Sequence, residues 1–212
     1  MPAVAAAAAA LTLGYLLGSV PTAAWLARLR GASIFEVGSG NMGAMNTARN
    51  LGLALGVLVA ALDAGKGALA TGIGLALAGP QAADPAAVGG HLAAPLAAGL
   101  GAVLGHGFSL YAGFRGGKGL ATTFGVALPL YPAGALVGAA LIIVLTLLMR
   151  RRSGLAAVIT VTLYPVLVGV TLITRGAAPA RTLTIAGGAA MLAVVVLLRH
   201  ALAYRRERRR SA

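Results

Sequence analysis

The chain of 212 residues contains no cysteine and only four acidic residues. Without cysteine, the protein has no disulfide, no thiol nucleophile and no cysteine-ligated metal. Charged residues make up 10% of the sequence, against about 25% in a typical soluble globular protein. This shortage of charge argues against a soluble globular domain.

Familiar catalytic signatures are also missing. The sequence has no Gly-x-Ser-x-Gly elbow of the kind found in serine hydrolases. None of the three histidines, His91, His106 and His200, has an aspartate five positions further on, which excludes the His-x4-Asp type of acyltransferase chemistry. Four acids and three scattered histidines also make no convincing metal cage, so we expect no metal site and no cofactor held by one.

The residues that are present make the chain apolar and basic at once. Hydrophobic residues form 59% of it, and 17 lysines and arginines against four acids give a formal net charge of +13. A soluble nucleic-acid-binding protein is not built from runs of Ala, Leu and Val, and a basic disordered chain is poor in apolar residues. A polytopic membrane protein fits both properties if its cations gather on one side. We therefore expect membrane lipid, and no nucleic acid, as a partner.

The apolar runs predict an all-α, polytopic integral membrane protein of about seven transmembrane or half-membrane helices. Pro21 is expected to kink the first run. Pro129 and Pro132 are expected to divide the fourth run into two short helices that return to the same side. The runs cover residues 2–26, 51–79, 92–104, 120–149, 155–174 and 183–198.

The positions of the cations predict the orientation of these helices. With the N-terminus outside and the C-terminus cytosolic, only Arg175 and Arg181 of the loop cations lie outside, and the arginine triplet at 150–152 lies inside. We expect one membrane-embedded domain over residues 1–204 and a basic cytosolic tail over residues 205–212. The tail, like Arg199, is interpreted as interfacial charge that attracts anionic lipid, at about 1 kcal/mol per cation.

The first unusual polar stretch, residues 38–49, reads GSGNMGAMNTAR. It formally contains the dinucleotide pattern G-x-G-x-x-G, but it follows a membrane run instead of a β-strand, which argues against that interpretation. Glycines let successive backbone N–H groups point at one anion, and a helix that starts after them adds positive potential. Further donors would be Ser39, Asn41, Asn46 and the guanidinium of Arg49. The alternative is a flexible loop at the membrane interface.

The second stretch is a pair of opposite charges inside an apolar helix. Asp63 and Lys66 are three residues apart, so they share one helical face and are able to pair. A charge at membrane depth costs roughly 2.5–3.5 kcal/mol on insertion scales and usually marks a site. The pair is therefore either a structural ion pair, a lining of the site, or both.

The third stretch, residues 105–123, reads GHGFSLYAGFRGGKGLATT. It resembles a phosphate-binding P-loop but lacks the first glycine of that motif and the Ser or Thr after the lysine. A glycine-rich turn that carries Arg115 and Lys118 and opens a helix suits a second phosphate. His106 is a candidate for a hydrogen-bonding wall residue, a general base or a cytosolic helix cap. Two such loops on one membrane face indicate two anionic ligands, or one ligand with two phosphates.

These three stretches resemble the ordered motifs of the bacterial acyl-phosphate:glycerol-3-phosphate acyltransferase family (PlsY), which run approximately GSGNxGATNxxRxLG, DxxKG and GHxFxxFxxFxGGKGxAT. In this chain they read GSGNMGAMNTARNLG, DAGKG and GHGFSLYAGFRGGKGLAT. The resemblance implies an inner-membrane enzyme whose site faces the cytosol. It also implies transfer of a fatty acyl group from acyl phosphate to the 1-hydroxyl of glycerol 3-phosphate, which gives lysophosphatidate and phosphate in phospholipid synthesis. Neither coenzyme A nor a metal is needed, and a monomer is expected.

The resemblance also assigns roles to individual residues. It implies that Ser39, Lys118 and His106 take part in catalysis. The ion pair of Asp63 and Lys66, expected from their spacing, is assigned a structural role. The residues expected to bind or orient the substrates are Gly40, Asn41, Gly43, Asn46, Arg49, Lys66, Gly116, Gly117, Gly119 and His200.

Three positions depart from the family pattern. Met45 stands where the family has a threonine, Ala203 where it usually has an asparagine, and residues 154–157 (Gly-Leu-Ala-Ala) where it is rich in serine. Each change removes a polar contact worth about 1–3 kcal/mol if a buried partner is left unsatisfied. The alternatives are therefore a paralogue that acts on another phosphorylated acceptor, or an enzyme of weakened activity. A non-enzymatic transporter of phosphate compounds is the remaining alternative.

Overall fold

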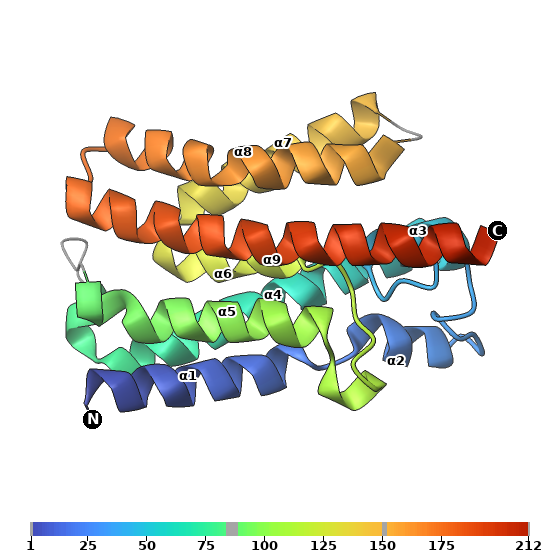
Figure 1. Cartoon of the computed structure of the whole chain (residues 1–212), viewed down its shortest axis with the longest axis horizontal. Coiled ribbons are helices and arrows are strands. Elements are labelled where there is room, and N and C mark those ends of the chain that lie inside the picture. The colour runs from blue at the N-terminus through green and yellow to red at the C-terminus, as the bar shows by residue number, and fades with distance from the viewer. Residues whose placement is uncertain (1, 84–88, 150–151, 212) are drawn as a thin grey trace.

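In the computed structural model, residues 2–83, 89–149 and 152–211 are described, and every regular element within these ranges is a helix (Figure 1). The α-helices are α1 (Ala3–Gly18), α2 (Thr22–Arg28), α3 (Ala44–Leu51), α4 (Leu53–Ala78), α5 (Ala93–Gly107), α6 (Leu120–Leu130), α7 (Pro132–Leu148), α8 (Ser153–Thr174) and α9 (Pro179–Ser211). Short 3-10 turns lie at η1 (Pro80–Ala83), η2 (Gly89–Leu92) and η3 (Leu110–Ala112).

The described residues contain five helical segments long and apolar enough to cross a membrane. These are Ala3–Arg28, Leu53–Ala78, Gly90–Ala112, Ser153–Thr174 and Pro179–Arg205. The apolar helices α6 and α7 are shorter. Together they make the seven pieces that the sequence predicts, so the prediction of an all-α polytopic membrane fold is confirmed.

Prolines set two of the breaks in these helices. α6 ends before Tyr131, and Pro132 is the first residue of α7. A residue that precedes proline is disfavoured in the helical conformation, and Tyr131 adopts φ −157°. The first span is likewise interrupted between α1 and α2, because Pro21 lacks the N–H that a continuous helix needs.

Glycines allow α1 and α5 to pack with their backbones in contact, side by side as in Figure 1. Each helix carries a Gly-x-x-x-Gly pair: Gly14 and Gly18 on α1 lie against Ala98 and Ala102, and Gly101 and Gly105 on α5 lie against the backbone around Tyr15. A Cβ atom on any of these four glycines would meet backbone atoms of the other helix. Small residues of this kind permit close helix association in lipid, where burial of apolar surface offers little driving force.

The same principle brings α6 against α4. A Cβ on Gly67 of α4 would meet the backbone of Thr122, and a Cβ on Gly125 of α6 would meet the backbone of Ala64. Beyond α6, aromatic packing connects α6 to α8, with the rings of Phe124 and Tyr164 edge-on at 5.2 Å between centroids. α6 is therefore fixed on both sides, and so is the glycine-rich loop that precedes it.

The termini lie at opposite ends of the helical bundle (Figure 1). α2, α3 and the loop before α6 lie toward the C-terminal end (Figure 1), so both glycine-rich stretches gather at one end of the molecule. α9 continues as a helix through the basic segment to Ser211. Arg150 and Arg151, residues 84–88 of the expected outside loop and the side chains of 206–212 lie outside the described residues. The direction of the bundle across the membrane stays a prediction.

The close packing of α1 on α5 predicts a specific cost for adding one methyl group. Gly101→Ala places a Cβ against Leu11 and Tyr15 backbone atoms and should destabilise the protein by about 1–3 kcal/mol through overpacking. Gly72→Ala is the matched control, because nothing lies within 4 Å of its Cβ position. It should be neutral or stabilising by up to about 1 kcal/mol. Thermal unfolding in detergent measures both variants, and equal midpoints for the two would contradict this packing.

Candidate active site

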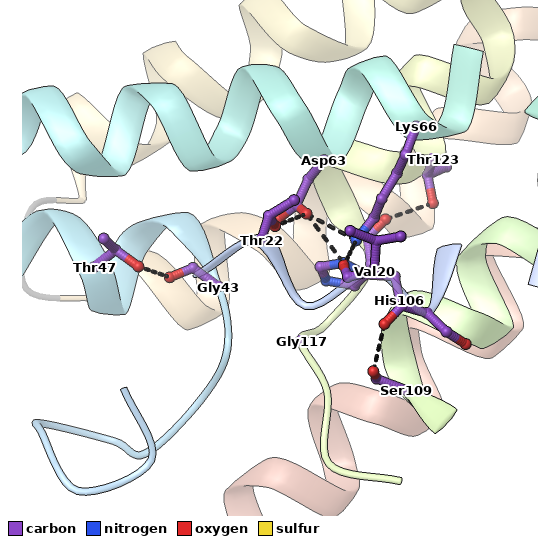
Figure 2. Close-up of polar contacts among 12 residues, drawn as sticks. Val20, Thr22, Gly43, Thr47, Asp63, Lys66, His106, Ser109, Gly117 and Thr123 are labelled. Atoms are coloured by element: carbon purple, nitrogen blue, oxygen red, sulfur yellow. Dashed lines mark hydrogen bonds and ion pairs between the residues drawn. The ribbon is translucent and has the colours of Figure 1, made fainter. Parts of the chain in front are cut away.

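A buried carboxylate connects three helices close to the glycine-rich loops (Figure 2). Asp63 on α4 is 1% exposed. Its Oδ1 accepts a hydrogen bond of 2.7 Å from the Thr22 hydroxyl of α2 and lies 2.9 Å from Lys66 Nζ. His106 Nδ1 on α5 lies 3.5 Å from the same oxygen. One acidic group therefore bonds α2 to α4, and α5 approaches the same oxygen through His106.

Lys66 has a second partner at the break between α1 and α2. Its Nζ donates a hydrogen bond of 3.1 Å to the carbonyl oxygen of Val20. That carbonyl is accessible because the chain stops being helical around Pro21. The pairing of Asp63 with Lys66 on one helical face is present, and the ammonium also secures the end of α1.

His106 lies between Asp63 and the second glycine-rich loop, and it is 3% exposed. Its carbonyl oxygen accepts a hydrogen bond of 3.0 Å from the Gly117 N–H. A Cβ at Gly117 would collide with Nε2 of the same histidine. His106 therefore contacts the second loop through both its backbone and its imidazole. It lies inside the protein and is not a helix cap that faces the cytosol.

Asn46 organises the first glycine-rich loop from inside. The residue is 8% exposed. Its Nδ2 donates to the carbonyl oxygens of Ile34, Val37 and Asn41 at 3.4, 3.1 and 3.0 Å. Its Oδ1 accepts from the Ser39 N–H at 3.1 Å. The amide of Asn46 is thus used to hold the loop in shape.

Some backbone groups expected to face an anion are used within this loop. The Gly40 N–H donates to Val37 O at 3.0 Å, and the Gly43 N–H donates to Asn41 O at 2.9 Å. Gly40 has φ +64°, in the left-handed region that favours glycine. α3 begins directly after Gly43 and, among the described residues, has no side-chain cap. The N–H groups of its first turn have no partner within the helix and are therefore available for a ligand.

The charged and hydroxyl side chains of this loop lie nearer the surface. Ser39 is exposed and Asn41 is partly buried. Arg49, at the end of α3, is exposed and donates from Nη2 to Ser153 Oγ at 2.9 Å. Ser153 begins α8, and sequence reasoning missed it. The available signal was a hydroxyl at the start of an apolar run, directly after a basic triplet.

The second loop carries Lys118 between two glycines. Gly119 adopts φ +89° and stands directly before α6, so the expectation of a glycine turn that opens a helix holds here. Lys118 is partly buried and interacts electrostatically with His200 of α9. His200 is 8% exposed, and its Nδ1 lies 2.9 Å from Val196 O of its own helix. Arg199, interpreted from the sequence as interfacial charge, is buried against Gly116 and Gly117 instead.

The two glycine-rich loops meet although they are far apart in sequence. A Cβ at Gly117 would come against the carbonyl oxygen of Met42 in the first loop. The Arg115 guanidinium lies 3.9 Å from the centroid of the Phe35 ring, a cation–π contact between the two segments. The two cationic, glycine-rich segments therefore lie side by side.

The departures from the family pattern lie around this site. Met45 is 41% exposed in the first turn of α3, Ala203 is partly buried one turn beyond His200, and Gly154 is exposed beside Ser153.

No described group of three His, Cys, Asp or Glu side chains comes together as metal ligands would. The described polar side chains of the two loops near the surface, Ser39, Asn41, Arg49 and Lys118, are a hydroxyl, an amide and two cations, which suit anionic ligands.

Comparisons with known proteins agree with this arrangement. Residues 8–209 match the family described as Glycerol-3-phosphate acyltransferase. A Myxococcus xanthus protein named "Glycerol-3-phosphate acyltransferase" is 39% identical over 207 residues, which are 95% of this chain and 98% of that protein. A Deinococcus radiodurans protein named "Glycerol-3-phosphate acyltransferase 1" is 48% identical over 117 residues, which are 55% of this chain and 54% of that protein.

Solved structures show the same fold. The glycerol 3-phosphate form of "PlsY (YgiH), an integral membrane glycerol 3-phosphate acyltransferase" has a TM-score of 0.74 at 29% identity and covers 94% of this chain and 90% of its own. The lysophosphatidic acid form of that protein has a TM-score of 0.70 at 28% identity, covering 92% and 87%. Fold and site thus define an integral membrane acyltransferase. The chain belongs to the glycerol-3-phosphate acyltransferase family.

The buried ion pair predicts that neutralising Asp63 alone destabilises the protein strongly, and that neutralising Lys66 as well recovers part of the loss. Asp63→Asn leaves the Lys66 ammonium, 6% exposed, without its counter-charge and should cost about 3–5 kcal/mol. Replacing both charges, as in Asp63→Asn with Lys66→Met, should recover part of that loss, because no charge then remains buried. Thermal unfolding in detergent compares the variants. A double variant no more stable than Asp63→Asn would contradict the pairing.

Proposed function

We propose that this protein transfers a fatty acyl group from acyl phosphate to the 1-hydroxyl of glycerol 3-phosphate. The products are lysophosphatidate and inorganic phosphate, at a site on the cytosolic side of the bacterial cytoplasmic membrane, in phospholipid synthesis. The observation that carries the proposal is the contact of the two glycine-rich loops at Met42 and Gly117. It brings two cationic, glycine-rich surfaces to one place, as a reaction between two phosphate-bearing substrates requires.

The cations divide between the two substrates. Arg49 lies on α3 after the first loop and Lys118 on the second, so each loop has at least one cation able to hold a phosphate. The solved relative in its glycerol 3-phosphate and lysophosphatidic acid forms supports an acceptor and a product of this chemistry. Ser39, Asn41 and the first turn of α3 add neutral donors around the first phosphate.

The reaction needs little beyond positioning and charge stabilisation. The 1-hydroxyl oxygen attacks the acyl carbon, a C–O ester bond forms, and the C–O bond to the phosphate breaks. The departing phosphate carries away the bonding electron pair and takes the hydroxyl proton. Lys118, Ser39 and loop N–H groups stabilise the negative charge that develops on the acyl oxygen and the phosphate. An acyl phosphate is already activated, so holding two anions side by side supplies most of the remaining acceleration.

The buried residues act by placing these groups. Asn46 shapes the first loop, and His106 and the glycines Gly116, Gly117 and Gly119 shape the second. Lys66, which is paired with Asp63, secures the break between α1 and α2, and the positive charge of Lys118 acts on His200. The fatty acyl chain lies between helices, open to the surrounding lipid. Both glycine-rich loops belong to one protein chain, so a monomer is sufficient for activity. No cofactor takes part in the proposed reaction.

The assay that tests this proposal follows phosphate release from palmitoyl phosphate by purified protein with and without glycerol 3-phosphate. We expect release that depends on glycerol 3-phosphate, with one lysophosphatidate formed for each phosphate, identified by mass spectrometry. Other polyol phosphates in place of glycerol 3-phosphate test the acceptor, given the departures at Met45 and Ala203. Exchange of a phosphorylated solute across vesicles without any chemistry would contradict the proposal.

Lys118→Ala should lower turnover by about 10²–10³-fold, the range seen when one group that stabilises a developing charge is removed. Arg175→Ala is the matched control, since it removes one exposed positive charge from the end of α8 and should leave turnover unchanged. Gel filtration in detergent verifies that both variants are folded. Near-normal turnover of Lys118→Ala would show that the second loop is not the site of acyl transfer.

A further inference from the structure

We propose that Arg199 is a positioning residue that holds the second glycine-rich loop in the conformation that presents Lys118 to the substrates. The proposal rests on the proposed function, in which Lys118 stabilises developing charge. It differs from the interpretation of Arg199 as interfacial charge, because the contacts of its side chain lie inside the protein.

Arg199 is 5% exposed, and its side chain reaches from α9 to the loop between α5 and α6. Its Nε donates to the carbonyl oxygen of Gly117 at 3.2 Å, and its Nη2 donates to that of Gly116 at 3.1 Å. Its guanidinium carbon lies 4.6 Å from the centroid of the Phe108 ring. Two adjacent carbonyl groups and one aromatic face thus fix the plane of the guanidinium.

The fit of the loop around this side chain is tight on both sides. A Cβ at Gly107 would meet the side-chain carbons of Arg199 at 3.2 Å, and a Cβ at Gly116 would meet the carbonyl oxygens of His106 and Gly107. The Gly117 N–H donates to His106 O while the Gly117 carbonyl accepts from Arg199. Gly117 is therefore held through both of its peptide groups.

This clamp has a direct consequence for Lys118. The peptide bond between Gly117 and Lys118 is planar, so fixing the Gly117 carbonyl also fixes the direction of the Lys118 N–H. Two successive glycines would otherwise leave that segment free to adopt many conformations. Arg199 thereby fixes the backbone from which the Lys118 side chain extends, and so the positions that its ammonium is able to reach.

The geometry of the guanidinium, and not its charge alone, makes this possible. An arginine offers several N–H donors in a rigid planar fork, whereas a lysine offers one compact ammonium on a flexible stem. A lysine at position 199 would keep the positive charge and would not hold two carbonyl oxygens and the Phe108 face together. Comparing arginine with lysine at position 199 therefore distinguishes positioning from simple electrostatic attraction.

A double-mutant cycle on phosphate release from palmitoyl phosphate tests the proposal. Arg199→Ala should lower kcat by about 10–100-fold through misplacement of the reacting groups. Arg199→Lys should stay closer to Arg199→Ala than to the unaltered protein. In a Lys118→Ala background, Arg199→Ala should cause almost no further loss, because residues that act through one group are not additive. Arg205→Ala, which removes an exposed arginine of the same helix, is the control and should leave kcat unchanged.

Several outcomes would overturn this role for Arg199. Full activity of Arg199→Ala beside an impaired Lys118→Ala would do so, as would full recovery by Arg199→Lys or multiplying losses in the double variant. A fall in kcat of Arg199→Lys matched by a large fall in the thermal midpoint would show general destabilisation instead of positioning. Failure of the proposed function is visible separately: the unaltered protein would then release no phosphate in response to glycerol 3-phosphate.

Discussion

The structure depends on one buried carboxylate. Asp63 is 1% exposed in a chain that has only four acidic residues. Its Oδ1 is shared by the Thr22 hydroxyl, the Lys66 ammonium and the His106 imidazole. α2 leads into the first glycine-rich loop, and α5 leads into the second. This buried charge thus lies where the helices that lead into both loops come together.

Glycine has two separate functions in this fold. On α1, α4, α5 and α6 it removes the side chain that would keep helix backbones apart, so α1 packs closely on α5 and α6 on α4. In the loops it supplies positive φ angles, as at Gly40 and Gly119.

The positive charge of the protein also has two separate locations. Arg49, Arg115 and Lys118 lie on the loops, whereas the basic segment continues α9 beyond the span.

Much of the architecture was predictable from the sequence. Apolar runs and prolines predicted the seven helical pieces, the break before Pro132 and the interruption at Pro21, because these follow from local chemistry. The starts of α3 and α6 after glycines were predictable for the same reason. The spacing of Asp63 and Lys66 was sufficient to propose their pairing.

Apart from the pairing of Asp63 with Lys66, the partners of the buried polar groups were not predictable. Asn46 was expected at the substrate and instead bonds within its own loop, and Arg199 was interpreted as interfacial and instead bonds carbonyl oxygens 82 and 83 residues away. Which carbonyls a loop leaves unpaired depends on its folded path, and a single sequence carries no signal of that path. The same reason hid Thr22 and Ser153, whose hydroxyls have distant partners.

The central claim is that the Asp63 carboxylate holds both glycine-rich loops in place, and hydrogen–deuterium exchange of Asp63→Asn against the unaltered protein tests it most directly. The account predicts faster exchange in residues 38–47 and also in residues 107–119, with α8 (Ser153–Thr174) unchanged as an internal reference. Faster exchange confined to α4 around position 63, with both loops unaffected, would contradict it.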